Sequence, residues 1–236
     1  MLTTAERTLA REHQASISAL TDFVQSEVSA LVMALEGQSP AVVREALLDL
    51  VPGVAAKYGD AAAALAMDYY EFAREAAEVP GMYIPAPAPL APPGRFEGSI
   101  RWAVGAVVGP EPSFEALGLR LGGSVSRAVV DVATDTLVGA TVSDERARGW
   151  SRILEPGACG FCRMLADRGA VYTEDTVRFA SHDNCRCSAS PQFSWGSGDR
   201  TVSTLPYQVS QRRLSERERR ARLDRAKEYI AANYSD

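Results

Sequence analysis

The sequence predicts an α+β fold that is predominantly α-helical. Before residue 150, long segments carry apolar side chains every three or four positions, which is the helical period. All four cysteines then fall within residues 159–187, where short strand-like segments flank one short helix. With 236 residues and 46% apolar residues, the chain can bury a core of its own. We divide it into a helical docking region (1–83), a proline-rich linker (84–94), a helical middle region (95–149), a Cys/His module (150–195) and a basic tail (196–236).

Residues 3–36 are expected to form one long helix. Thr3 and Glu6 have the spacing of a capping box at its start. Apolar residues recur along one face: Ile17, Leu20, Val24, Val28, Leu31 and Leu35. At 1.5 Å per residue the helix would be about 50 Å long. We expect one small domain to leave such a seam partly uncovered, and therefore expect this region to dock onto a partner.

Two shorter helices are expected next. Ser39 is a suitable N-cap with Pro40 in the first helical position, and this helix should run to about Leu50. Pro52 should disturb it, because a proline inside a helix removes one backbone hydrogen bond. An alanine-rich helix should then cover about residues 60–78.

The proline-rich segment 84–94 has the composition of an extended spacer. Beyond it, residues 97–108 and 113–139 again show helical periodicity. Gly122 and Gly123 should bend or break the second of these helices, because glycine lowers helix stability.

The charges are distributed unevenly along the chain. Residues 1–83 carry 5 basic and 12 acidic side chains, whereas residues 151–236 carry 14 and 11. The acidic front half argues against nucleic-acid binding there, since phosphate contacts need clustered cations. Residues 211–230, with 8 basic and 4 acidic side chains, could hold DNA without reading its sequence. No leader or membrane span is evident, so we expect synthesis in the cytoplasm and no membrane partner.

The Cys/His module contains five candidate zinc ligands: Cys159, Cys162, Cys185, Cys187 and His182. Their pattern is C-x2-C followed by H-x2-C-x-C. We predict strands at 150–157, 170–173 and 185–189, with a helix after Cys159. On a strand, Cys185 and Cys187 would point to the same face. Thiolates and imidazole select zinc, and four protein ligands leave no position for water, so the predicted site is structural.

Three other interpretations of the cysteines remain open, of which the simplest is that they are plain buried residues. A thiol–disulfide oxidoreductase could use Cys159 and Cys162, whose C-x2-C spacing resembles a thioredoxin motif. Disulfides are the third interpretation, and they are disfavoured in the cytoplasm.

No other catalytic pattern is evident. The chain has two histidines, and His13 on the first helix is expected to be solvated. Neither GxxxxGK[ST] nor GxGxxG occurs, so no phosphate-binding loop is predicted. We therefore expect no enzyme activity and no small-molecule substrate.

The segment EPGACGFCRMLADRGAVYTEDTVRFASHDNCRC resembles the signature region of the MuF-like minor head proteins of tailed bacteriophages, in particular the actinobacterial-phage group. The resemblance covers about residues 146–193. It implies a low-copy virion protein, made in the host cytoplasm and associated with the portal inside the head, without an established catalytic activity. Its expected partners are the portal protein or the major capsid protein, and packaged DNA through the basic tail. A zinc-stabilised nucleic-acid-binding protein is the alternative from the binding class.

Overall fold

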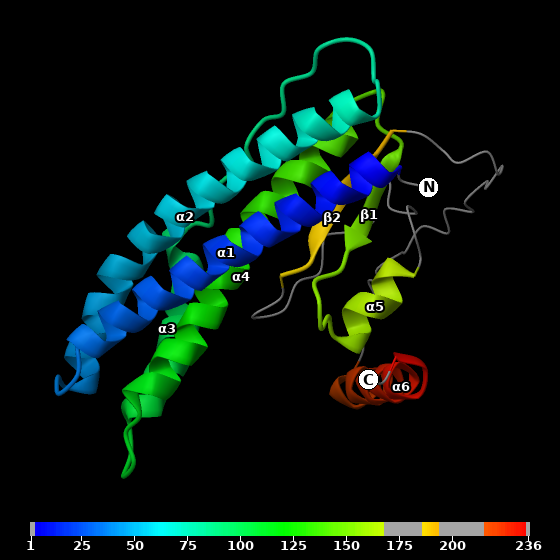
Figure 1. Cartoon of the computed structure of the whole chain (residues 1–236). Helices are drawn as coiled ribbons and strands as arrows, with labels where there is room; N and C mark the ends of the chain where they lie inside the picture. Colours follow the sequence, from blue (N-terminus) through cyan, green and yellow to red (C-terminus); the bar gives the residue numbers. More distant parts are fainter. Residues whose placement is uncertain (1–2, 168–185, 194–214, 235–236) are drawn as a thin grey trace.

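The structure is a computed structural model that describes residues 3–167, 186–193 and 215–234. Over these residues the fold is mostly helical with one small antiparallel sheet, which confirms the predicted α+β class (Figure 1). Three long helices form the body: α1 (Thr4–Ala34), α2 (Pro40–Ala76) and α4 (Phe114–Ser143). The shorter α3 (Phe96–Val104) packs on α2 and α4, and short 3-10 turns at Pro93–Arg95 and Gly105–Val107 flank it.

Helix α1 forms over the predicted residues and starts with the predicted capping box. The backbone N–H of Glu6 donates to Oγ1 of Thr3 at 3.2 Å, and the N–H of Thr3 donates to the Glu6 carboxylate at 2.5 Å. Within the apolar seam of α1, Ile17, Val24 and Val28 are 0–1% exposed, whereas Leu20, Leu31 and Leu35 are partly buried. Helices α2 and α4 cover this seam. Because α2 is itself 37 residues long, it covers much of the seam within the chain, and only Leu20, Leu31 and Leu35 remain partly exposed.

The expected interruption at Pro52 is wrong, since α2 is one continuous helix. The buried stripe that contains Val43, Leu47 and Val51 continues beyond the proline with Val54. A proline inside a helix costs about 3 kcal/mol. Burial contributes about 1.5–3 kcal/mol for each aliphatic side chain, so packing on both sides of Pro52 outweighs the lost backbone hydrogen bond.

The expected break at Gly122 and Gly123 is also wrong, because α4 continues through both residues. These glycines are buried where α4 packs on α1. A Cβ atom on Gly122 would lie 2.2 Å from Oε1 of Gln25 on α1. The space at Gly122 holds the end of the Gln25 side chain, and the packing of α4 on α1 overrides the weak helix propensity of glycine.

The proline-rich segment lies on the surface of the helices (Figure 1). The backbone N–H of Ala88 donates to Oγ1 of Thr136 on α4 at 2.9 Å. Leu90 packs so close to α2 that a Cβ on Gly59 would lie 2.7 Å from its Cδ2 atom. The helices before and after this segment thus form one bundle, with the segment held against its outside.

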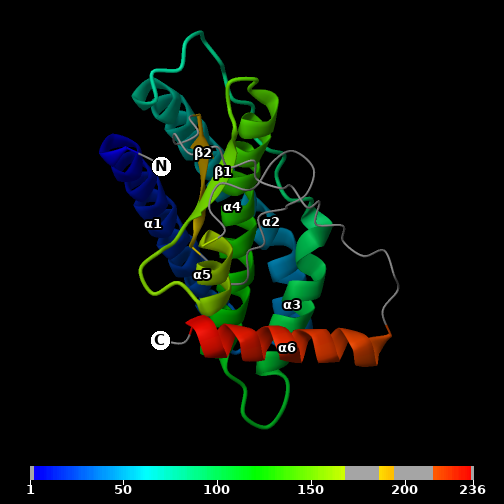
Figure 2. The ribbon, with the colours of Figure 1, turned by 90° about the vertical axis from the view of Figure 1, so that its right-hand side faces the viewer.

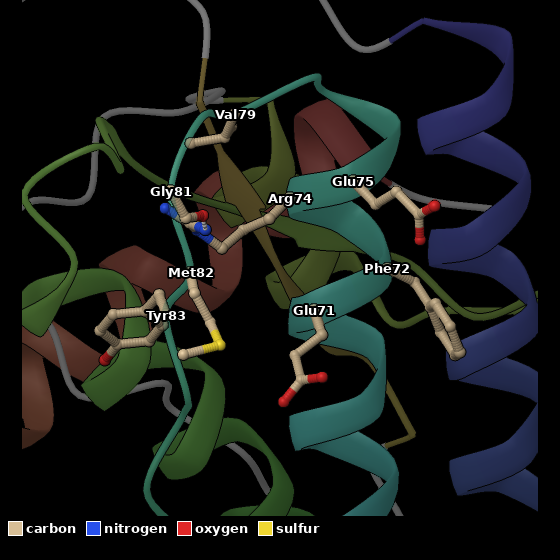
Figure 3. Close-up of a pocket in the computed structure, with 8 residues that line it drawn as sticks. All are labelled: Glu71, Phe72, Arg74, Glu75, Val79, Gly81, Met82 and Tyr83. Atoms are coloured by element: carbon tan, nitrogen blue, oxygen red, sulfur yellow. Dashed lines mark hydrogen bonds between the residues drawn. The ribbon is translucent and has the colours of Figure 1, made fainter.

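A buried ion pair joins the ends of α2 and α4. Nε of Arg74 lies 2.7 Å from Oδ2 of Asp144, the C-cap of α4, and the two side chains are 8% and 4% exposed. The Tyr70 hydroxyl donates to the same carboxylate oxygen at 3.0 Å. Arg74 also donates from Nη1 to the carbonyl oxygen of Gly81 at 2.7 Å, and Figure 3 shows it reaching from α2 towards that loop. One buried carboxylate therefore connects two helices, while its arginine partner holds the loop.

We predict that Asp144→Ala lowers the free energy of unfolding by about 3–5 kcal/mol, because it leaves the Arg74 charge buried without its counter-charge. Urea denaturation followed by circular dichroism measures this loss. Glu27→Ala is the control: it removes the acceptor of the Tyr58 hydroxyl and the partner of Lys57, in an ion pair whose Glu27 and Lys57 side chains are 35% and 61% exposed, and its effect should be far smaller. Equal losses of unfolding free energy in the two variants would show that the buried Arg74–Asp144 pair contributes no more to stability than the exposed Glu27–Lys57 pair.

Candidate metal centre

The Cys/His module (150–195), called the cysteine module below, follows shortly after Asp144, the C-cap of α4. Strand β1 (Gly149–Ile153) pairs antiparallel with β2 (Ser188–Gln192), with Gly149 opposite Gln192 and Ile153 opposite Ser188. Helix α5 (Gly160–Ala166) packs on β1, and both strands contact α4. The first predicted strand and the predicted helix are therefore confirmed. The strand predicted at 170–173 lies outside the described residues.

Three of the five predicted ligands lie in the described part of this module. Cys159 is the N-cap residue of α5 and is exposed, whereas Cys162, in the first turn, is fully buried. Cys187 is also fully buried and lies just before β2, not within a strand as predicted. Cys185 and His182 lie outside the described residues. Within those ranges no three His, Cys, Asp or Glu side chains converge as metal ligands, so the zinc site stays a prediction.

A buried arginine contacts one of the cysteines. Arg152 on β1 is 5% exposed, and its Nη1 lies 3.7 Å from Sγ of Cys162. Arg152 was not among the residues predicted from the sequence, because an arginine in a short strand has no metal-ligand spacing that marks it. The one sequence feature that could have identified Arg152 is a charged residue between Trp150 and Ile153, within a short apolar strand that is expected to be buried.

Arg186, between Cys185 and Cys187, is held from several sides. Its backbone N–H donates to Oε1 of Glu155 at 3.1 Å, and its carbonyl oxygen accepts from Nε2 of Gln14 at 3.3 Å. Its guanidinium pairs with Asp22. Since Gln14 and Asp22 belong to α1, the first helix fixes the backbone that leads into β2.

A second contact fixes β2 to the bundle through Tyr69, whose ring stacks on His13. The hydroxyl of Tyr69 on α2 donates to Oγ of Ser190 at 2.9 Å, and its ring stacks on the His13 imidazole with centroids 4.5 Å apart. The expectation that His13 is solvated is wrong, because this residue is 5% exposed and continues the buried face of Ile17. Burial lowers the pKa of His13 to about 4, and the hydrogen bond with the Leu65 backbone opposes this shift.

A shallow hollow lies beside Arg74, between the last turns of α2 and the loop that follows this helix. Its volume is about 350 Å³, and Figure 3 shows Glu71 on α2 and Met82 in the following loop at its wall. Arg74, the basic residue of the lining, is already engaged by Asp144. The lining contains glutamates and apolar side chains but neither cysteine nor histidine, so it does not resemble the cysteine module in its chemistry.

The family model of the VG15 protein matches residues 4–210. The chain belongs to the VG15 protein family. VG15 is a viral family, and the match indicates a phage-type protein. No curated protein and no solved structure matches the chain. The matched range includes both the helical bundle and all five predicted ligands, so the VG15 family region combines the two parts.

Helix α6 (Glu216–Tyr234) follows the residues matched to the VG15 family. It packs across α5, as Figure 2 shows, and Nη2 of Arg163 donates to the carbonyl oxygen of Tyr234 at 2.5 Å. A Cβ on Gly160 would lie 2.5 Å from Cγ2 of Ile230, so the contact is close. Several basic side chains of α6 are exposed: Arg217, Arg220, Arg225 and Lys227. Within the described residues of this VG15-family chain, no helix is long and apolar enough to cross a membrane.

We predict that His13 makes this VG15-family protein acid-sensitive. Its pKa is about 4 in the folded state against 6.5 when exposed, so between these values the unfolded chain binds more protons. The stability linked to the neutral imidazole is complete above about pH 6.5 and is lost as the pH falls towards about 4.

His13→Phe keeps an aromatic ring against Tyr69 and removes this proton linkage. From about pH 7.5 to about pH 5, wild type should lose about 2 kcal/mol more unfolding free energy than the variant. Denaturant titrations at both pH values measure the difference, and His182 cancels because both proteins contain it. Parallel pH dependence in the two proteins would show that His13 is not the cause.

Proposed function

We propose that this protein is a minor head protein of a tailed phage, which associates with the portal or major capsid protein inside the head and catalyses no reaction. The observation that carries the proposal is the VG15 family match over residues 4–210, together with the ordered motif C-x2-C and H-x2-C-x-C. That motif resembles the signature of the MuF-like minor head proteins. On this proposal the chain is made in the host cytoplasm and enters the virion.

The proposed contact with the portal or capsid lies on the outer surface of residues 1–83. The seam of α1 is covered by α2 and α4, so a partner would have to use other side chains. Phe23 and Met33 on α1, and Val42 on α2, are 63%, 47% and 46% exposed. They lie within residues 1–83, which carry 12 acidic and 5 basic side chains. Apolar anchors with acidic surroundings suit a partner surface that is apolar at its centre and basic at its rim.

Polar replacement of these anchors tests the proposal. The variant Phe23→Ser/Met33→Ser/Val42→Ser should fold, because all three side chains are exposed, but it should be incorporated into heads at less than about a tenth of the wild-type level. Quantitative mass spectrometry of purified heads measures incorporation. Leu119→Ser on α4, where the side chain is 61% exposed, is the matched control outside residues 1–83 and should be incorporated normally. Wild-type incorporation of the triple variant would refute a contact through this surface.

We also propose that one structural zinc holds the cysteine module, with Cys159, Cys162, Cys185 and either Cys187 or His182 as ligands. Thiols that are buried in a small sheet-and-helix unit suit zinc, as do Cys162 and Cys187 here. An oxidoreductase is the second candidate, because an exposed Cys159 and a buried Cys162 also suit an attacking and a resolving thiol. The dithiol needs no metal and the zinc site does, so the metal content separates them.

The exposed basic side chains of α6 support a further part of the proposal, namely contact with packaged DNA. In the full chain, Arg217→Gln/Arg220→Gln/Arg225→Gln should weaken binding to duplex DNA at low salt and flatten its salt dependence. Asp224→Asn, on the same helix, should strengthen binding, because it removes a negative charge. Fluorescence anisotropy with duplexes of different base composition measures both effects.

If all of these variants bind duplex DNA as the wild type does, the tail is excluded as the DNA contact. Strong preference for one base sequence would instead favour the zinc-stabilised nucleic-acid-binding protein, since phosphate contacts alone carry no sequence information.

A further inference from the structure

The hollow beside Arg74 has a floor that the fold holds in place. Nη1 of Arg74 donates to the carbonyl oxygen of Gly81 at 2.7 Å, and Cζ of the same arginine lies 5.7 Å from the ring centroid of Tyr83. The Tyr83 ring packs in turn on Tyr70, with centroids 5.5 Å apart. The volume of the hollow, about 350 Å³, lies near the lower end of the range for binding sites in proteins. A space of this size suits one inserted side chain.

Large apolar side chains at this hollow are exposed to solvent. Met82 in the loop is 90% exposed, Ile84 two residues later is 68% exposed, and Phe72 on α2 is 54% exposed. Figure 3 shows Met82 opposite Glu71 across the hollow. A methionine side chain is flexible and polarisable, so it can adapt to an incoming group. Exposed apolar side chains that gather within a polar rim are typical of a protein-binding surface.

The exposed charges at the hollow are acidic. Glu71 and Glu75 belong to its lining and lie one helical turn apart on α2, and the exposed Glu78 follows just after the end of that helix. Like charges at this spacing repel each other, and the helix dipole also disfavours carboxylates near a helix C-terminus. Arg74, the basic residue of the lining, is paired with Asp144. A cationic partner would relieve both unfavourable effects.

Helix α6 carries a surface of complementary chemistry. Tyr229 is 55% exposed, and the exposed Arg225 lies one turn before it on the same face. The close contact of α6 with α5 uses Ile230, which leaves the face of Tyr229 towards solvent. Tyrosine and arginine are among the side chains that most often anchor one protein on another. This face therefore offers an aromatic anchor with a cation beside it.

The α6 helix of a chain does not reach the hollow of the same chain. Figures 1 and 2 both show the loop after α2 at one end of the molecule and α6 near the other end, where it packs on α5. A second copy of the chain can bring its α6 to this hollow. Each copy then offers one hollow and one helix, so the contact can repeat from copy to copy.

We propose that copies of this chain associate through these two surfaces, with Tyr229 of one copy in the hollow of the next and Arg225 beside Glu71 and Glu75. The contact depends neither on the zinc site nor on the portal contact, and it adds self-association to the proposed function. Arg220, on the opposite side of α6 from Tyr229, stays available for DNA.

The first arm of the test changes the hollow of the full-length protein. Glu71→Lys/Glu75→Lys reverses its charges, and the variant should fold because both residues are exposed and lysine is favourable near a helix C-terminus. Glu45→Lys/Asp49→Lys is the matched control, with the same charge change at the same spacing on exposed residues near the start of α2. Sedimentation velocity over a range of concentrations gives the dissociation constant for self-association.

We expect wild type to self-associate at low ionic strength and to dissociate as salt screens the charges. Glu71→Lys/Glu75→Lys should raise the dissociation constant at least about tenfold, because like charges would then meet in the contact. The control should associate as wild type does. Equal weakening in the control would overturn the proposal, since net charge would then be the cause.

The second arm changes the helix and then combines the variants. Arg225→Glu/Tyr229→Ser removes the anchor of α6 and should also weaken self-association at least about tenfold. Mixed with Glu71→Lys/Glu75→Lys, it supplies an intact hollow for the intact α6 of the other variant. The mixture should therefore associate more tightly than either variant alone.

A mixture that associates no better than its separate components would overturn the pairing of these two surfaces. A wild-type chain that stays monomeric at low ionic strength, up to its highest soluble concentration, would also overturn it and leave the hollow to a basic segment of another protein. Neither result would bear on the portal contact, which is measured by incorporation into heads.

Discussion

The buried pair between Arg74 and Asp144 is the contact on which the arrangement of the chain depends. It joins the last turn of α2 to the C-cap of α4, and β1 begins five residues after Asp144 at Gly149. The same carboxylate accepts from the backbone N–H of Arg146 at 3.0 Å, so it also shapes the turn into the strand. Burial and the neighbouring Asp144 carboxylate raise the pKa of Tyr70, which keeps its hydroxyl a donor to that group. The position of the cysteine module relative to the bundle is thus set by a buried carboxylate.

The bundle then supports the module from a second direction. Tyr69 on α2 holds Ser190 on β2, and Gln14 on α1 holds the carbonyl oxygen of Arg186. Both contacts join residues more than a hundred positions apart in the sequence. Any rearrangement of β2 would therefore have to break contacts with α1 and α2. In this VG15-family chain the helical bundle and the cysteine module are therefore joined by side-chain contacts from two helices.

The sequence predicted those features that depend on local patterns. The capping box and the apolar period of α1 were sufficient to predict this helix with nearly the ends that the structure shows. Pro52 and Gly122 misled the prediction because both have poor helix propensity, and only the packing of α1, α2 and α4 shows why the helices continue. His13 looked solvated because its neighbours are charged, although it faces Tyr69. Arg152 was missed because its meaning comes from Cys162, which lies on another element.

Zinc is proposed to hold the cysteine module of this phage-type protein together. The most direct measurement is elemental analysis of the full chain, purified anaerobically without chelators. We expect about one zinc per chain, lost in Cys159→Ser and Cys185→Ser, with the helical circular dichroism of the bundle largely retained. Wild-type protein that contains no metal under these conditions would contradict it.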